Sequence, residues 1–321
     1  MSTTRRKISS FVAVLAVFLA GACSSGESSD SQSSGTSSGD TRTVTDGQGR
    51  KVEVPKEPER VVVLNDELLD DALALDVTPV AITNGQGQPG PATYLQDRVG
   101  DIPVIGDVNR PNIESIVSAK PDLILMSYVL DEDELSQLEE IAPTYVANDD
   151  KDYWKDTFTR VGDALNRGDD AEKVLSDYDA SVQSLKGDLG DKASSTVTIA
   201  RWNADGPVVM GDGSFAATVL ADVGLTRPES QADITGQGHG DPISLEALNI
   251  LDADWIFVSA LDPSGPDGQA LTEGTSSEAF RQVPAVAAGH TSTVDGSVWG
   301  AAGGPLASQQ VLDDVRSALV S

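Results

Sequence analysis

The chain has 321 residues, of which 22 are Lys or Arg, 51 are Asp or Glu and 2 are His, so its formal net charge is −29. A surface this acidic repels nucleic acid and anionic lipid headgroups, which argues against a polyanion as partner and favours a neutral or cationic ligand. Acidity that only maintains solubility outside the cell is the alternative. With two histidines and a single cysteine, the chain also cannot build a zinc or manganese site from several His ligands.

The N-terminal segment has the layout of an export signal. Basic residues at positions 5–7 precede an uncharged run, 8–22, which is too short for a comfortable membrane span. The cysteine, Cys23, follows Leu-Ala-Gly-Ala, the arrangement of a bacterial lipidation signal. We therefore predict a signal peptide over residues 1–22 and lipidation of Cys23; a cysteine that belongs incidentally to the signal is the alternative. Removal of the signal takes away three basic residues and leaves 19 against 51 acidic ones, a formal charge of −32.

Residues 23–42 are predicted to form a flexible linker behind the lipid anchor. From Ser24 to Asp40 the chain is almost entirely Ser, Gly, Asp, Gln, Thr and Glu. Such a composition does not bury enough apolar surface to offset the entropy lost on ordering. As a flexible coil the linker spans about 20 to 25 Å, so the folded part is expected to reorient freely at the membrane.

Beyond Thr41, short apolar strands alternate with helical stretches, the pattern of an α/β protein. In the first half the predicted elements are 61–64, 67–75, 79–82, 104–105, 113–118 and 123–126. In the second half they are 196–200, 215–222, 245–248, 255–258, 293–294 and 305–319. We therefore predict an N-terminal α/β lobe over residues 43–168 and a C-terminal α/β lobe over residues 191–321.

A long amphipathic helix is predicted between the lobes, over residues 169–190. Its apolar positions recur at three- and four-residue steps; they are Ala171, Val174, Leu175, Tyr178, Val182, Leu185 and Leu189. Asp169 and Asp170 are expected to cap its N-terminus, and Gly190 marks its end. At about 1.5 Å per residue the helix is about 30 Å long, which suits a rigid strut between lobes. A surface helix within one large domain is the alternative.

The two lobes contain an internal repeat. Residues 113–114 with 122–127 superimpose without gaps on residues 245–246 with 254–259. In both copies a short helix with a Glu in its first turn leads through an Asp into a buried strand that ends in Ser. A matched pair of lobes joined by a stiff helix leaves a cleft between them, facing the carboxyl ends of the strands.

Three side chains are predicted to line this cleft. Arg201 and Trp202 close the first strand of the second lobe, and Trp299 lies in a Gly-rich stretch before the last helix. At such positions Trp and Arg stack on a flat or chelated ligand and donate hydrogen bonds to its oxygens. The alternatives are a core position for Trp202 and a surface position for Arg201.

Two motifs that suggest an enzyme lack the context they need. The stretch 85–90 matches G-x-G-x-x-G, but Pro89 and its neighbours indicate an irregular loop at the cleft rim and not a helix that holds a dinucleotide. His239 and His290 lie beside glycines, and no candidate nucleophile has the context of a Ser-His-Asp site. An extracellular α/β hydrolase is therefore the weaker class of function.

A series of short motifs gives the chain a family resemblance. They are Val44-Thr45-Asp46, Val52-Glu53-Val54-Pro55, Arg60-Val61-Val62-Val63, Pro111-Asn112-Ile113-Glu114, Lys120-Pro121-Asp122-Leu123-Ile124 and Ser244-Leu245-Glu246. With the central helix, they make nearly all of residues 43–319 resemble the siderophore-binding members of the helical-backbone class of ABC-transporter solute-binding proteins.

This resemblance implies a fold and a function. The fold is of the class III periplasmic-binding-protein type, with two Rossmann-like lobes joined by a single long α-helix. The expected function is to capture a ferric siderophore in the interlobe cleft and to deliver it to an ABC permease dimer, as a lipid-anchored monomer outside the cytoplasmic membrane. No cofactor and no catalysed reaction are expected. Cobalamin or haem is the alternative ligand for the same fold.

The resemblance also assigns roles to residues. Arg110 and Tyr128 stand within a few positions of the ligand-contacting Arg and Tyr of hydroxamate binders. His239 stands seven residues before Glu246, where some catecholate binders place a metal-ligating His, but the Tyr that accompanies that His is replaced here by Gly300. Direct ligation of the metal is therefore not expected. Glu114 and Glu246 match the acidic pair that engages arginines of the permease; a simple preference of acids for helix N-termini is the alternative.

Overall fold

The computed structural model describes residues 40–129, 131–149 and 153–320. The predicted signal peptide, the lipidation site at Cys23 and the linker up to residue 39 lie outside the described residues. In the part that is described, no helix combines the length and the apolar character needed to cross a membrane.

The N-terminal lobe begins earlier than predicted. Strand β1 (Thr41–Thr45) pairs with β2 (Lys51–Pro55) in an antiparallel hairpin. Arg42 in β1 forms an ion pair of 3.2 Å with Asp163. Because these contacts order the chain from Thr41, the predicted end of the linker at residue 42 is wrong.

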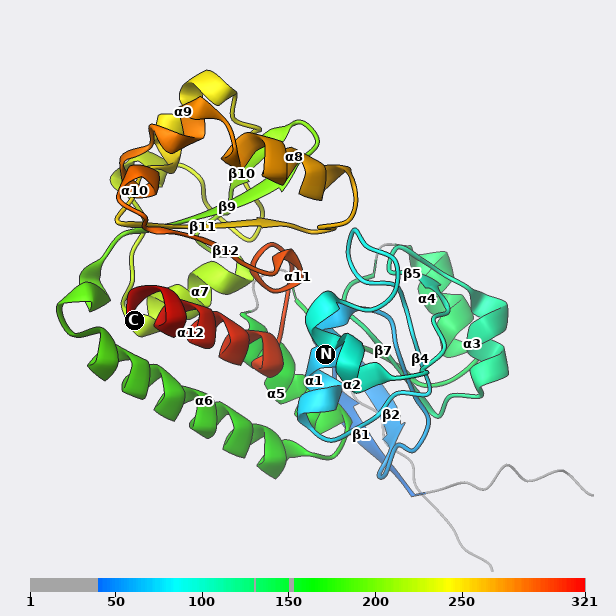
Figure 1. Cartoon of the computed structure of the whole chain (residues 1–321). Coiled ribbons are helices and arrows are strands. Elements are labelled where there is room, and N and C mark those ends of the chain that lie inside the picture. Colours follow the sequence, from blue (N-terminus) through cyan, green and yellow to red (C-terminus); the bar gives the residue numbers. More distant parts are fainter. Residues whose placement is uncertain (1–39, 130, 150–152, 321) are drawn as a thin grey trace, which may run out of the picture. The chain divides into compact units, whose positions relative to one another are not determined.

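The N-terminal lobe is a parallel sheet with helices around it (Figure 1). Its strand order is β4-β3-β7-β8, and every neighbouring pair is parallel. The sheet strands are β3 (Val61–Val63), β4 (Ala81–Ile82), β7 (Leu123–Met126) and β8 (Thr144–Val146). The helices are α1 (Asp66–Ala74), α2 (Gln96–Val99), α3 (Ile113–Ala119), α4 (Glu132–Glu139) and α5 (Trp154–Ala164), with a small hairpin of β5 (Gly106–Asp107) and β6 (Arg110–Pro111).

The C-terminal lobe repeats this plan with one antiparallel strand. Its order is β10-β9-β11-β12, in which β10 alone runs against its neighbour. The strands are β9 (Val197–Asn203), β10 (Gly206–Val209), β11 (Trp255–Ala260) and β12 (Thr291–Thr293). The helices are α7 (Phe215–Val223), α8 (Pro266–Thr275), α9 (Glu278–Arg281), α10 (Pro284–Ala287), α11 (Gly296–Trp299) and α12 (Pro305–Leu319), with the 3₁₀ helix η4 (Leu245–Leu251).

Helix α6 (Gly168–Leu189) joins the lobes and packs on both (Figure 1). Near its start Ala171 belongs to the core of the N-terminal lobe, and from Tyr178 onward its buried side chains belong to the core built on α7 and α12. The predicted architecture, two Rossmann-like lobes joined by a long helix, is confirmed. The predicted capping by Asp169 and Asp170 is wrong, because Arg167 occupies the N-cap and the two acids lie in the first turn, where they still favour the helix dipole.

The repeat has a structural meaning in both lobes. Asp122 accepts the backbone N–H of Arg60 at 2.9 Å, and Asp254 accepts that of Thr196 at 2.7 Å. Each aspartate thus fixes the residue that precedes the first strand of its own sheet. The copies differ in the preceding helix, which is α-helical in α3 and 3₁₀ in η4.

Two short elements differ from the sequence pattern. Residues 104–105 form no strand, because Val104 makes only an isolated bridge to Ile82. Strand β12 starts two residues before the predicted stretch 293–294, where Thr291 pairs with Ile256 of β11. In both places the hydrogen-bonding partner, and not the local apolar run, decides where the strand lies.

Candidate ligand-binding site

A cavity of about 330 Å³ lies between the lobes, lined by residues that follow the carboxyl ends of the strands in both sheets. From the N-terminal lobe come Asn65, Glu67, Gln86, Tyr128 and Asn148. From the C-terminal lobe come Arg201, Met210, Gly213, Ser214, Phe215, Thr218, Gln237, Gly238, His239 and the stretch 300–303, while Tyr153 and Trp154 lie where α5 begins. Ligands of open α/β sheets bind at this edge because helix N-termini and loops meet there.

The N-terminal wall is a hydrogen-bonded group of polar side chains. Asn65 is the N-cap of α1 and accepts the backbone N–H of Leu68. The Nδ2 amide of Asn148 donates to Glu67 Oε2 at 3.0 Å and to the Tyr128 hydroxyl at 3.3 Å. Asn148 is buried, and its Oδ1 has no hydrogen-bond partner within the described residues. This wall therefore offers acceptor oxygens to a ligand.

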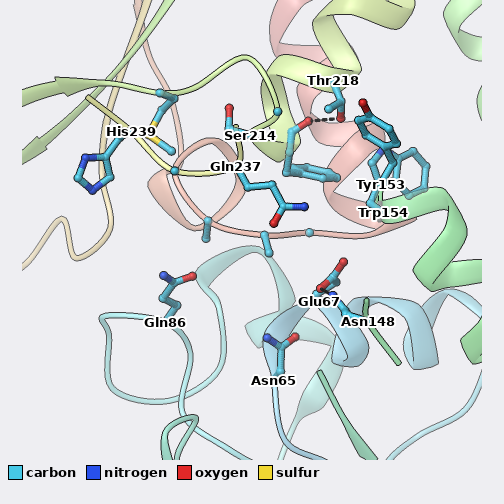
Figure 2. A pocket seen from close by; sticks show the side chains of 18 of the residues that line it. Asn65, Glu67, Gln86, Asn148, Tyr153, Trp154, Ser214, Thr218, Gln237 and His239 are labelled. Atoms are coloured by element: carbon cyan, nitrogen blue, oxygen red, sulfur yellow. Dashed lines mark hydrogen bonds between the residues drawn. The ribbon is translucent and has the colours of Figure 1, made fainter. Parts of the chain in front are cut away.

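The C-terminal wall rests on two glycine loops. The Gly211 N–H donates to Gly238 O at 2.8 Å, and the Gly213 N–H donates to Gly236 O at 3.0 Å. A Cβ at Gly211 would collide with the Gly236 carbonyl oxygen, so only glycine allows this approach. The loops hold the Gln237 side chain opposite Gln86 and Asn65 of the other lobe (Figure 2).

Arg201 supplies the cationic group of the cavity; no other Lys or Arg is among its lining residues in the described chain. Its guanidinium is half-buried and donates to Gly300 O at 2.7 Å. Burial lowers the pKa of Arg201, and Asp267 opposes that shift in part. A Cβ at Gly300 would lie 2.7 Å from the Arg201 side chain, so the glycine provides its space.

Aromatic side chains close one end of the cavity. The Trp154 ring meets Tyr178 of α6 edge to face at 5.0 Å and Phe215 of α7 at 6.0 Å. Tyr153, beside it, is 60% exposed. Trp154 is thus fixed by the core while it lines the site, and Tyr153 is the ring that is open to solvent (Figure 2).

The prediction that Trp202 and Trp299 line the cleft is wrong. Trp202 follows Arg201 on β9, and because alternate side chains of a strand point to opposite faces, it packs against Phe280 at 5.6 Å in the core, where it is 1% exposed. Trp299 belongs to α11 and is fully buried, stacked on Phe257 at 4.3 Å.

The other predicted site residues divide into two groups. Tyr128 and His239 line the cavity together with Arg201. Gln86 also lines the cavity, so the predicted rim loop contributes to it. The His239 ring lies toward the edge of the site (Figure 2). Arg110 is exposed on the β5–β6 hairpin and does not line the cavity, so its predicted role in ligand binding has no support in the geometry.

The proposed docking residues lie on the surface. Glu114 and Glu246 are exposed in the first turns of α3 and η4. Neither lines the cavity between the lobes. Their placement therefore separates any docking role from ligand binding.

Several lining residues were missed in the sequence. Asn65 and Asn148 each stand two residues beyond the last residue of a parallel strand, β3 and β8 respectively. A polar side chain just beyond a parallel strand indicates a lining residue, but a search restricted to charged and aromatic residues overlooks it. Trp154 was missed because it opens a helix with an otherwise ordinary amphipathic pattern.

Over residues 40–129, 131–149 and 153–320, no group of three or more His, Cys, Asp or Glu side chains is arranged to hold a metal ion.

Buried acids of α1 lie behind the cavity and connect the lobes. Asp70 accepts the backbone N–H groups of Leu306 and Ala307 at the start of α12, both at 2.8 Å, and the Tyr94 hydroxyl at 2.8 Å. Burial raises the pKa of Asp70 to about 6 in spite of these bonds. Asp71 is fully buried and neither of its oxygens has a partner among the described residues; burial, then Glu67 and Asp70, raises its pKa well above the usual range.

We expect Asp71→Asn to stabilise the protein more at pH 8 than at pH 5. The unfolded chain releases the Asp71 proton near pH 4, whereas the folded chain keeps it to higher pH, so the free energy of unfolding falls as pH rises above about 4. Removing the unpartnered carboxylate should raise that free energy at pH 8 by about 1 to 3 kcal/mol. Urea unfolding at both pH values measures this.

The matched control is Asp76→Asn, which removes an exposed carboxylate just beyond the same helix. Its effect on the free energy of unfolding should be the same at pH 5 and pH 8. An equal gain for Asp71→Asn at the two pH values would show that Asp71 does not titrate with a raised pKa.

Three comparisons place the chain among known proteins. A model of the family described as periplasmic binding protein matches residues 61–297. The chain is 34% identical to the probable siderophore-binding lipoprotein YfiY of Bacillus subtilis (strain 168), and the match covers 96% of both chains. It is 27% identical to the Fe(3+)-citrate-binding protein YfmC of the same strain, and that match covers 90% of this chain and 89% of YfmC. Among solved structures it is 30% identical to Staphylococcus aureus SirA complexed with staphyloferrin B, with a TM-score of 0.74 over 87% of this chain and 98% of SirA.

Proposed function

The chain belongs to the periplasmic binding protein family, and we propose that it captures a ferric siderophore in the cavity between its lobes and delivers it to an ABC importer. The observation that carries this proposal is a polar and aromatic cavity shared by two lobes, in a chain that is similar over 96% of its length to a protein named as a probable siderophore-binding lipoprotein. Binding between two lobes lets a ligand contact both at once and favour their closed arrangement.

The role of each wall follows from its chemistry. Arg201 and the amides of Gln86 and Gln237 donate hydrogen bonds to the oxygens of a chelate. The Tyr153 ring offers an apolar face to its backbone. The metal arrives already wrapped by the siderophore, so the protein supplies no metal ligand and no cofactor of its own.

We propose that the protein acts as a lipid-anchored monomer. Cys23 carries the lipid, the segment behind it is the tether, and the molecule lies on the extracytoplasmic face of the membrane. The similarity to a protein named as a lipoprotein supports this arrangement. Glu114 and Glu246, one on each lobe, contact the permease. Cobalamin or haem remains the competing ligand class, and it is tested in the same experiment.

Titration with a ligand panel tests the proposal. Ferric siderophores should quench the tryptophan fluorescence of the purified protein with a dissociation constant of about 1 μM or below, whereas haem and cobalamin should not saturate at these concentrations. Trp154 is the tryptophan that lines the cavity, so Trp154→Phe should lose most of the quenching. Saturable binding of haem or cobalamin alone would overturn the siderophore assignment.

A further inference from the structure

An acidic side pocket adjoins the main cavity. It has a volume of about 210 Å³ and shares Asn65, Glu67, Gln86, Tyr128 and Ala302 with the main cavity. Its other lining residues are Leu64, Asp66, Val108, Asn109, Met126, Ser127 and Glu134. No Lys, Arg or His of the described chain lines this side pocket, so its three carboxyl groups, Asp66, Glu67 and Glu134, face no basic side chain there.

The three carboxylates of the side pocket differ in their surroundings. Asp66 accepts the backbone N–H groups of Gln86 and Ala92, which ties the rim loop to α1. Glu67 accepts the side-chain amide of Asn148. Glu134, half-buried in the first turn of α4, makes no hydrogen bond or ion pair with any residue that the structure describes. Burial and then the neighbouring Asp131 raise the pKa of Glu134.

A second observation points to a ligand in the side pocket. Ser127 is 7% exposed, and its hydroxyl has no hydrogen-bond partner within the described residues. It lines the side pocket directly after β7. A buried hydroxyl without a partner is costly, and a bound donor such as an ammonium group would satisfy it. Asn148 Oδ1, in the main cavity, is a further unpartnered acceptor on the same side.

The charges of the two cavities select among iron chelates. Together they present three carboxylates, Asp66, Glu67 and Glu134, against the single guanidinium of Arg201. A ferric tris-catecholate is strongly anionic and would be repelled by this set. A ferric trishydroxamate is neutral, because each hydroxamate cancels one charge of the ferric ion, and a protonated amine on its backbone would be attracted.

We infer that the site takes a hydroxamate-type ferric chelate bearing a protonated amine, with the chelate in the main cavity and the ammonium in the side pocket against Glu134 and Ser127. This inference rests on the proposed function of ferric-siderophore binding. The ammonium donates to Glu134 and the Ser127 hydroxyl, and it neutralises part of the acidic surface. Glu134 is thereby a specificity-determining residue and Arg201 the group that orients the chelate.

The test uses a pair of probes that differ only in the amine. Ferrioxamine B is a linear ferric trishydroxamate with a terminal ammonium group, and its N-acetyl derivative lacks that charge. The wild-type protein should bind ferrioxamine B about tenfold more tightly than the acetylated form, which corresponds to about 1.4 kcal/mol. Glu134→Gln should lower the affinity for ferrioxamine B about tenfold and so abolish this preference. Ferric tris-catecholates should bind more weakly than either.

The matched control is Glu132→Gln, which removes an exposed carboxylate from the first turn of the same helix; it should keep the tenfold preference. Equal affinities of the wild type for the two probes, or an unchanged preference in Glu134→Gln, would overturn the inference while leaving ferric-siderophore binding in place. Tighter binding of a tris-catecholate than of both hydroxamates would overturn it as well. Failure of every ferric chelate to bind would instead contradict the proposed function itself.

Discussion

Uptake of ferric siderophore by cells is expected to be lost when Glu114 and Glu246 are both replaced by Ala, while siderophore affinity stays at the wild-type value. The two acids are exposed, one on each lobe, and both lie outside the cavity. Exposed carboxylates that pair with arginines of a partner set the orientation of docking. If the protein docks on a permease dimer as proposed, each acid contacts one half of that dimer, so removing both should lower the uptake rate at least about tenfold.

A matched double variant separates docking from surface charge. Glu132→Ala with Glu278→Ala also removes one exposed, first-turn acid from each lobe, so it has the same net charge and the same loss of helix-dipole stabilisation. It should transport normally. Wild-type uptake by the Glu114→Ala, Glu246→Ala variant, with radioactive iron as the readout, would show that these acids only stabilise helix ends.

The repeat was the most informative part of the sequence. It predicted that β7 corresponds to β11 and that Asp122 corresponds to Asp254. A parallel strand that is buried on both faces requires a continuous apolar run, and in both copies an Asp stands directly before this run. The long helix was predictable for a similar reason. Its apolar spacing continues for the full length of α6, and this long apolar stripe is buried because the helix packs against the cores of both lobes.

The site was harder to predict from the sequence than the fold. Arg201 and Trp202 are adjacent, and the sequence cannot say which of them faces the cleft, since a shift of one residue in a strand exchanges the faces. The walls are also built from loops far apart in the chain, such as Gly211 against Gly238. A contact of that kind depends on tertiary packing and leaves no periodic pattern in either segment.

Trp299 is where sequence and structure disagree most. The ring is fully buried, stacks on Phe257 at 4.3 Å, and donates from Nε1 to Asp314 at 2.7 Å. Burial raises the pKa of Asp314, while this hydrogen bond opposes the shift. Trp299→Ala should therefore lower the free energy of unfolding by about 3 to 5 kcal/mol, through the cavity it leaves and the lost stacking.

Urea unfolding of Trp299→Ala, Trp299→Phe and Tyr153→Ala distinguishes a core role from a ligand-binding role. Trp299→Phe keeps a ring against Phe257 and loses the hydrogen bond to Asp314, so it should be less destabilised than the Ala variant. Tyr153 is exposed at the cavity, and its removal should weaken siderophore binding by about 1 to 3 kcal/mol and leave the unfolding midpoint in place. If Trp299→Ala instead kept the wild-type midpoint and weakened ligand binding, the ring would belong to the cleft, as its Gly-rich sequence context first indicated. The buried stacking pair is expected to give the opposite result, because a fully enclosed ring contributes to stability through the contacts it already makes and has no surface left to offer a ligand.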